Sequence, residues 1–358
     1  MTHVIDDGAT YELCAIPRLL AQHRHPNIER LEPRHDRWLT EHYPFATDHA
    51  RDAFLAQRSA LWTALTYPVT DEDRFYDLAR LTSFLFAFDD LFLQAGPKSH
   101  TDAKQVLEDT LQVMQGGPPA TAHGSALAQI WQTMAQRMPA RQRHRLVEAT
   151  QDFATGCFRE VSSRQRGSVL DLANYTSVRV EQSLAAWVYF ILTEYAAGVD
   201  LPDPVLARLR PLHWACAEHL LFSNDLFSFR AEHFCGDHVN AVCVLLETGA
   251  TLQQAIDKIV GLVTLKEKQV ADMLTALRHS RLGAESGPES AYLRHLEYVI
   301  SGNLEQSRFA ARYHGSAELV HRPIHSGTVT LFTDRTDHRR SPSTLDPPGI
   351  SMPPSGRA

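Results

Sequence analysis

Positions 224–232 of the chain read NDLFSFRAE, a stretch in which oxygen-bearing side chains recur at every fourth position. Asn224, Ser228 and Glu232 are spaced i, i+4 and i+8. In an α-helix each four-residue step turns the chain by only about 40°, so the three side chains lie along one face. The stretch therefore predicts a helix that carries a ladder of three oxygen ligands.

The residues around this ladder are apolar. Positions 220–222 read LLF, and positions 226, 227 and 229 carry Leu, Phe and Phe, which indicates a buried helix. A buried polar group without a partner costs about 1–3 kcal/mol. The ladder therefore predicts a bound cation, and oxygen ligands suit Mg²⁺ or Mn²⁺ better than zinc or copper. The alternative is a solvated polar stripe on an amphipathic helix.

A pair of carboxylates lies upstream, where the apolar run 84–88 (FLFAF) leads into Asp89 and Asp90. Asp89 follows Phe86 and Leu85 by one helical turn and would cap an apolar wall. Two adjacent carboxylates in such a place need water, a metal ion or a cationic side chain. A polar helix end paired with Arg or Lys is the alternative, although the helix dipole disfavours carboxylates near a C-terminus.

A third polar pair, Arg312 and Tyr313, follows the helical pattern of residues 302–311. A guanidinium and a phenol side by side can donate hydrogen bonds to an anion. The alternative is an ordinary charged helix end.

Taken in order, the aspartate pair, Arg179, the Asn/Ser/Glu ladder and the Arg-Tyr pair resemble the class I terpene synthases of the bacterial type, over residues 10–315. The ladder matches that family's N-D-x-x-S-x-x-x-E motif in full. Gly302 and Asn303 match its Gly-Asn on the last helix, and Trp38 matches its N-terminal Trp.

The resemblance implies an all-α protein: one α-helical bundle of the class I terpenoid synthase fold, with a central active-site cavity. It also implies Mg²⁺ as cofactor, as three ions that Mn²⁺ can replace. Asp89 and Asp90 would bind metal on one side, and Asn224, Ser228 and Glu232 on the other. The implied partners are an isoprenyl diphosphate and a second copy of the chain in a homodimer.

The resemblance further assigns the diphosphate to four side chains, Arg179, Arg230, Arg312 and Tyr313. Of these, Arg179, Arg312 and Tyr313, together with Asp89, are implied to be catalytic. The implied reaction is ionisation of farnesyl diphosphate, then cyclisation or water capture to a sesquiterpene, with release of diphosphate. The alternatives are a monoterpene or diterpene synthase acting on geranyl or geranylgeranyl diphosphate, a chain-elongating prenyl synthase, and a non-catalytic relic of the fold.

A carbocation requires a dry pocket, and aromatic rings attract cations by about 0.5–2 kcal/mol. Seven residues are expected to form its wall: Phe86, Trp62, Trp187, Phe190, Phe222, Asn303 and Gln306. Each aromatic residue is alternatively ordinary core. Gln306 belongs to an inward face with alternating four- and three-residue spacing. It stands where the family carries a Trp, so it could hold a water and favour a hydroxylated product, unless another aromatic residue has replaced that Trp.

The chain departs from the family motifs at three further positions. Gln94 stands where an acidic residue usually ends the aspartate motif, Gln182 follows Arg179 in place of Asp, and Ala231 replaces a Lys before Glu232. None of these positions carries a metal ligand in the assignment that the resemblance implies. They bear on closure of the site and on its diphosphate contacts.

Composition excludes several other classes. The net charge of −7 over 358 residues, without a basic cluster, argues against a nucleic-acid partner. Five scattered cysteines without a C-x-x-C pair predict a reduced, cytoplasmic protein. The longest apolar run, 184–192, is too short to span a membrane. His233, Cys235 and His238 are too few for a zinc site and are expected to be helix-end residues.

The domain organisation is expected to be simple. Residues 1–12 are predicted to be mobile, residues 13–332 to form the helical domain, and the Pro-rich stretch 333–358 to be disordered. The sequence GGPP at 116–119 predicts a break between two helices. No series of strands with turn spacing is apparent.

Overall fold

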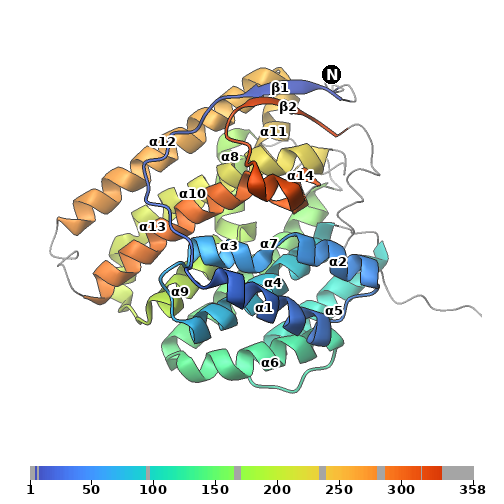
Figure 1. Cartoon of the computed structure of the whole chain (residues 1–358), viewed down its shortest axis with the longest axis vertical. Coiled ribbons are helices and arrows are strands. Elements are labelled where there is room, and N and C mark those ends of the chain that lie inside the picture. Colours follow the sequence, from blue (N-terminus) through green and yellow to red (C-terminus); the bar gives the residue numbers. More distant parts are fainter. Residues whose placement is uncertain are drawn as a thin grey trace, which may run out of the picture.

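The computed structural model describes residues 5, 8–93, 97–164, 171–233, 239–279, 287–315 and 317–332. Its helices are α1 (Ile28–His42), α2 (Asp48–Ala56), α3 (Ser59–Thr66), α4 (Glu72–Leu93), α5 (Pro97–Met114), α6 (Ala122–Arg137), α7 (Ala140–Arg164), α8 (Leu172–Val178), η1 (Arg179–Ser183), α9 (Ala186–Ala197), α10 (Asp203–Glu232), α11 (Ala241–Glu247), α12 (Leu252–Arg278), α13 (Pro288–Ser307), α14 (Ala311–His314) and η4 (Ala317–His321). Two short strands, β1 (Thr10–Leu13) and β2 (Gly327–Thr330), complete the described part (Figure 1).

Helix α10 runs through the middle of the bundle (Figure 1). It packs against α12, α13, α14, α11 and α9, while α4 packs against α3, α6, α7 and α9. From residue 212 to residue 231 most of its side chains are buried. A helix that is apolar on almost every side is stable only inside a protein, so the remaining helices are arranged around it.

The break predicted at 116–119 separates α5 from α6. In α6, Leu127, Ile130, Trp131 and Met134 are buried on one face, as expected for an amphipathic helix. In the described part of the chain, no helix is both long and apolar enough to cross a membrane.

The two strands differ from the expectation of a wholly helical chain. β1 and β2 pair antiparallel, with Tyr11 opposite Val329, and both of these side chains are buried. On the outer edge of β1, Gln253 of α12 bonds the N–H and the C=O of Glu12, both at 2.9 Å. Four-residue strands carry too short an alternation to be recognised in sequence. Residues 10–12, part of the segment expected to be mobile, therefore lie in a strand, whereas the predicted disorder of 333–358 lies outside the described residues.

Helix α13 approaches α3 unusually closely at Gly302. A Cβ atom at this position would lie 2.3 Å from the backbone oxygen of Leu65 and 2.8 Å from the backbone nitrogen of Thr66. Only a glycine therefore allows this contact between the helices. It matters for the site because α13 also carries Asn303 and Gln306.

We expect Gly302→Ala to destabilise the protein by about 1–3 kcal/mol, because the new methyl group must push two backbones apart. Gly261, on an exposed part of α12, has no atom within 4 Å of the equivalent position. Gly261→Ala should therefore stabilise the protein by about 0.5–1 kcal/mol through helix propensity. Urea unfolding of both variants measures the difference, and equal midpoints would contradict the close-contact explanation.

Candidate active site

A cavity of about 110 Å³ lies between α4, α9, α10, α13 and α14. Most of the residues singled out in the sequence converge on it from separate parts of the chain. The predicted site residues that line it are Trp62, Phe86, Asp89, Arg179, Asn224, Asn303, Gln306, Arg312 and Tyr313.

One wall of the cavity is acidic and is formed by the last turns of α4. Arg312 Nη2 lies 3.3 Å from Asp89 Oδ2 and 3.3 Å from Asp90 Oδ1. Burial raises the pKa of Asp90 to about 6; the nearby Arg312 guanidinium lowers it, and Asp89 raises it further. The aspartate pair thus faces a cation that the chain itself supplies.

The opposite wall includes Asn224, the first residue of the oxygen ladder of α10. The Asn224 side-chain amide donates a 2.6 Å hydrogen bond to the hydroxyl of Tyr313. Ser228 and Glu232 follow on the same helix, and Ser228 is fully buried. Burial raises the pKa of Tyr313 to about 12, so this phenol is protonated at neutral pH.

The two walls meet at α14. This four-residue helix places Arg312 against the aspartate pair and the next residue, Tyr313, against Asn224. The His314 ring bonds the backbone oxygen of Ser307 at 2.9 Å and holds the short helix to the end of α13. Asp89 of the aspartate pair and Asn224 of the ladder therefore line the same cavity, whereas Asp90, Ser228 and Glu232 are not among its lining residues.

Asn240 was not predicted from the sequence. Its side chain contacts the last two residues of the ladder, Ser228 and Glu232. Its side-chain amide donates to Glu232 Oε2 at 3.0 Å and to the backbone oxygen of Asp225 at 2.8 Å, with Ser228 Oγ at 3.4 Å. Its own oxygen accepts from the N–H of Val242 and caps α11. An Asn directly before the apolar run 241–246 is a typical helix N-cap and could have been recognised in the sequence. The hydrogen bond from the same side chain to Glu232 could not.

Asp225, the other polar residue of the motif, points away from the cavity. Its Oδ2 accepts hydrogen bonds from the Tyr175 hydroxyl at 2.7 Å and from the N–H of Ala241 at 2.8 Å. This buried carboxylate therefore ties α10 to α8 and to the first turn of α11. Its position favours a structural role.

The apolar part of the cavity is aromatic. The Trp62 ring lies 5.7 Å from the Phe86 ring and 4.9 Å from the Tyr189 ring. Trp62 Nε1 donates to Asn303 Oδ1 at 3.2 Å, and Gln306 is buried and lines the same space. Tyr189 was not predicted, and it lines the cavity from α9.

Asp90, Ser228 and Glu232 are not among the residues that line this cavity, and four further predicted site residues lie elsewhere. Trp187 and Phe190 line a neighbouring cavity, because they share the other face of α9. Phe222 is buried in the core and is not among the residues that line the site. Arg230 Nε donates to the backbone oxygen of Thr330 at 2.8 Å, so this side chain holds β2 and does not reach the cavity.

The remaining sequence predictions have mixed outcomes. Arg179 lines the cavity from the π-helical turn η1, which is separated from α10 by α9. Gln182 faces the neighbouring cavity, with Arg159 Nη1 3.4 Å from its side-chain oxygen. Gln94, Cys235 and His238 lie outside the described residues.

The donor set fits a hard divalent cation. The Asp89 carboxylate, the Asn224 amide and the Tyr313 hydroxyl line the cavity, and Mg²⁺ prefers oxygen ligands such as carboxylates and amides. The Arg312 guanidinium already occupies a cation position beside the aspartate pair. Within the described ranges, no three His, Cys, Asp or Glu side chains are grouped as a metal site.

The sequence profile described as terpene synthase family 2, C-terminal metal binding, matches residues 80–269. Microbial terpene synthase-like protein 13 from Selaginella moellendorffii is 29% identical over 309 residues, 81% of this chain and 84% of that protein. Sesquiterpene synthase 1 from Postia placenta is 26% identical over 284 residues, 76% of this chain and 81% of that protein.

A solved structure has the same fold. The linalool/nerolidol synthase from Streptomyces clavuligerus, in complex with 2-fluorogeranyl diphosphate, superimposes with a TM-score of 0.68 at 23% identity. The match covers 82% of this chain and 98% of that structure.

We expect Asn240→Asp to destabilise the protein by about 1–3 kcal/mol, because a buried carboxylate then faces Glu232 with no donor between them. The new side chain keeps the shape and the capping oxygen of Asn240, so α11 retains its cap. Adding Glu232→Gln supplies an amide that can donate to the new carboxylate and should recover more than half of the loss. Urea unfolding of the four proteins in this double-mutant cycle measures the coupling; additive losses would show that the two side chains do not interact.

Proposed function

Because this chain belongs to terpene synthase family 2, it is a class I terpene synthase, a lyase with the class I terpenoid synthase fold, and we propose that it converts farnesyl diphosphate into a sesquiterpene with Mg²⁺. One observation carries this proposal. Arg312 and Tyr313, adjacent on α14, contact the aspartate pair and the oxygen ladder on opposite walls of one cavity.

Metal binding is proposed for both walls. Asp89 and Asp90 would hold Mg²⁺ on the α4 side, and Asn224, Ser228 and Glu232 on the α10 side, with three ions in all and Mn²⁺ as a substitute. When bound, Mg²⁺ stabilises the negative charge that develops on the departing diphosphate. Asn240 and Tyr313 support this role by fixing Glu232 and Asn224 through hydrogen bonds.

The diphosphate is proposed to bind between Arg179, Arg312 and Tyr313. A guanidinium donates two parallel hydrogen bonds to an anion, and the protonated phenol donates a third. Arg312 would exchange its carboxylate partners for phosphate oxygens, and Asp89 and Asp90 would become free to bind metal. The cavity of about 110 Å³ is smaller than the roughly 300 Å³ of typical ligand sites, which supports this movement of Arg312.

The proposed reaction begins when the bond between the allylic carbon and the diphosphate oxygen breaks and its electron pair leaves with the diphosphate. Arg179, Arg312 and Tyr313 stabilise the charge on the leaving group. Trp62, Phe86 and Tyr189 surround the allylic cation with ring faces and exclude water. The cation is then consumed by proton loss or by addition of water, and Gln306 is the side chain proposed to hold such a water.

Several finer features belong to the proposal. The C15 substrate is supported by the relative named as a sesquiterpene synthase, and geranyl diphosphate is the second candidate, supported by the C10 analogue in the Streptomyces structure. The bacterial type of the enzyme is supported by the order of its motifs. A cytoplasmic location is supported by the four free cysteines of the described chain, and a homodimer rests on the family resemblance alone.

We expect volatile products when the protein is incubated with Mg²⁺ and farnesyl diphosphate and the hexane extract is analysed by gas chromatography and mass spectrometry. Geranyl and geranylgeranyl diphosphate should be poorer substrates, and EDTA should abolish turnover. A sesquiterpene alcohol would support the role of Gln306, whereas purely cyclised hydrocarbons would contradict it. Longer diphosphates would indicate chain elongation, and no turnover with any substrate would indicate a relic.

We expect Arg312→Gln to lower kcat about 10²–10³-fold, because a donor to the leaving group is lost. Arg230→Gln is the matched control; it removes the same charge from a residue that contacts β2, so kcat should stay within a few-fold of wild type.

Asn224→Ala should abolish turnover and leave the helical circular dichroism unchanged. Equal losses in both Arg variants, or an active Asn224→Ala, would overturn the residue assignment.

A further inference from the structure

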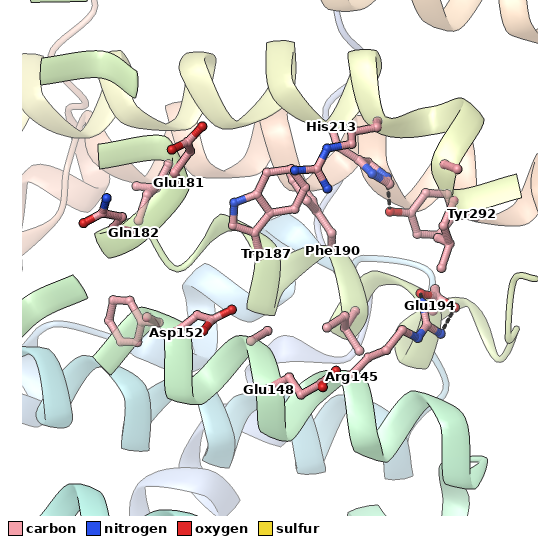
Figure 2. A pocket seen from close by; sticks show the side chains of 17 residues that line it. Arg145, Glu148, Asp152, Glu181, Gln182, Trp187, Phe190, Glu194, His213 and Tyr292 are labelled. Atoms are coloured by element: carbon pink, nitrogen blue, oxygen red, sulfur yellow. Dashed lines mark hydrogen bonds and ion pairs between the residues drawn. The ribbon is translucent and has the colours of Figure 1, made fainter. Parts of the chain in front are cut away.

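A second, larger cavity of about 400 Å³ lies beside the active site (Figure 2). It opens between α7, η1, α9 and α10, and it is separated from the active-site cavity by Phe153 and Leu184, which line both. Trp187 Nε1 donates to the backbone oxygen of Val180 at 2.8 Å and ties α9 to η1 at this point. None of the residues proposed for catalysis lines this space.

The floor of the second cavity is an aromatic cluster. The Phe190 ring stacks on the His213 ring at 4.8 Å, and the Trp187 ring meets Phe190 edge-on at 5.5 Å. The His213 Nε2 atom lies 2.7 Å from the Tyr292 hydroxyl, and a dashed line marks this hydrogen bond in Figure 2. Burial lowers the pKa of His213 to about 3, so the floor is uncharged at physiological pH.

The rim of the cavity is acidic. Glu148 and Asp152 stand on α7, and Glu181 stands across the opening on η1; all three are exposed (Figure 2). Arg145 does not offset them, because both of its terminal nitrogens bond Glu194, at 2.8 and 2.9 Å. The guanidinium of Arg210 lies 5.2 Å from the centre of the Trp187 ring.

We propose that this cavity is a second ligand site, and that its ligand is an organic ammonium ion with an aromatic or apolar body. The body would pack on the floor formed by Trp187, Phe190 and His213, and the positive charge would lie among the carboxylates of the rim. The apolar floor suits the body of such a ligand, and the acidic rim suits its positive charge.

Three properties carry the assignment. First, the cavity volume falls in the range of about 300–1,000 Å³ that small-molecule sites occupy. Second, the floor consists of aromatic rings, whose faces attract cations, and the Arg210 guanidinium lies 5.2 Å from the centre of one of them, Trp187. Third, three carboxylates face one guanidinium around the opening, so the rim attracts cations and repels anions such as a diphosphate.

The probe for this site is benzyltrimethylammonium chloride, titrated calorimetrically into the full-length protein without substrate. Wild-type protein should bind it with millimolar affinity or better. Benzyl alcohol, which keeps the ring and lacks the charge, should bind at least ten-fold more weakly. Asp152→Asn together with Glu181→Gln should weaken ammonium binding at least ten-fold, whereas Asp272→Asn on the exposed face of α12 should leave it unchanged.

The same titration separates this site from the active site. Binding should persist in the Asn224→Ala variant and in the presence of Mg²⁺ with inorganic diphosphate, because neither reaches the second cavity. A change of affinity in either experiment, including tighter binding beside the bound diphosphate, would place the probe among the active-site aromatics and overturn the proposal. No binding to wild-type protein, or equal affinity in the rim variant, would overturn it as well. The titration uses no turnover, so its outcome is independent of the proposed function.

Discussion

The polar side chains in the last turns of α10, of which Asp225 and Ser228 are buried, are the constraint on which the rest of the structure depends. A polar group without a partner in an apolar bundle costs about 1–3 kcal/mol, so each must find a partner. Asn224 finds Tyr313 of α14, Asp225 finds Tyr175 of α8 and the first N–H of α11, and Glu232 finds Asn240. The short helices around α10 are thus placed by the hydrogen bonds that this helix requires.

The charged side chains of α4 also need a partner. The aspartate pair of α4 would be costly in an apolar wall, and Arg312 lies within 3.3 Å of both carboxylates. This pairing places the positive charge of Arg312 beside both carboxylates, and Arg312 also lines the cavity. In the proposed function a metal-bound diphosphate would replace both partners at once, because it offers anionic oxygens to Arg312 and cations to the aspartates.

Helix α9 divides two environments. Ala186 and Tyr189 face the active-site cavity, whereas Trp187, Phe190 and Glu194 face the second one. The turn η1 is shared as well, with Arg179 on the first side and Glu181 and Gln182 on the second. One short segment therefore positions both a proposed diphosphate donor and part of the acidic rim.

The sequence by itself determined the helical fold, the ladder 224–232, the aspartate pair and the Arg-Tyr pair, because helix periodicity and neighbour relations are local. It also indicated that Gln306 faces inward. Only the tertiary structure decided which face of α9 meets which cavity, that Arg230 holds β2, and that Asn240 supports Glu232. These three features depend on contacts between residues that are far apart in the chain or separated by a loop. The helical period of 3.6 residues shows which residues share a face of a helix, but it carries no information about which other helix packs against that face.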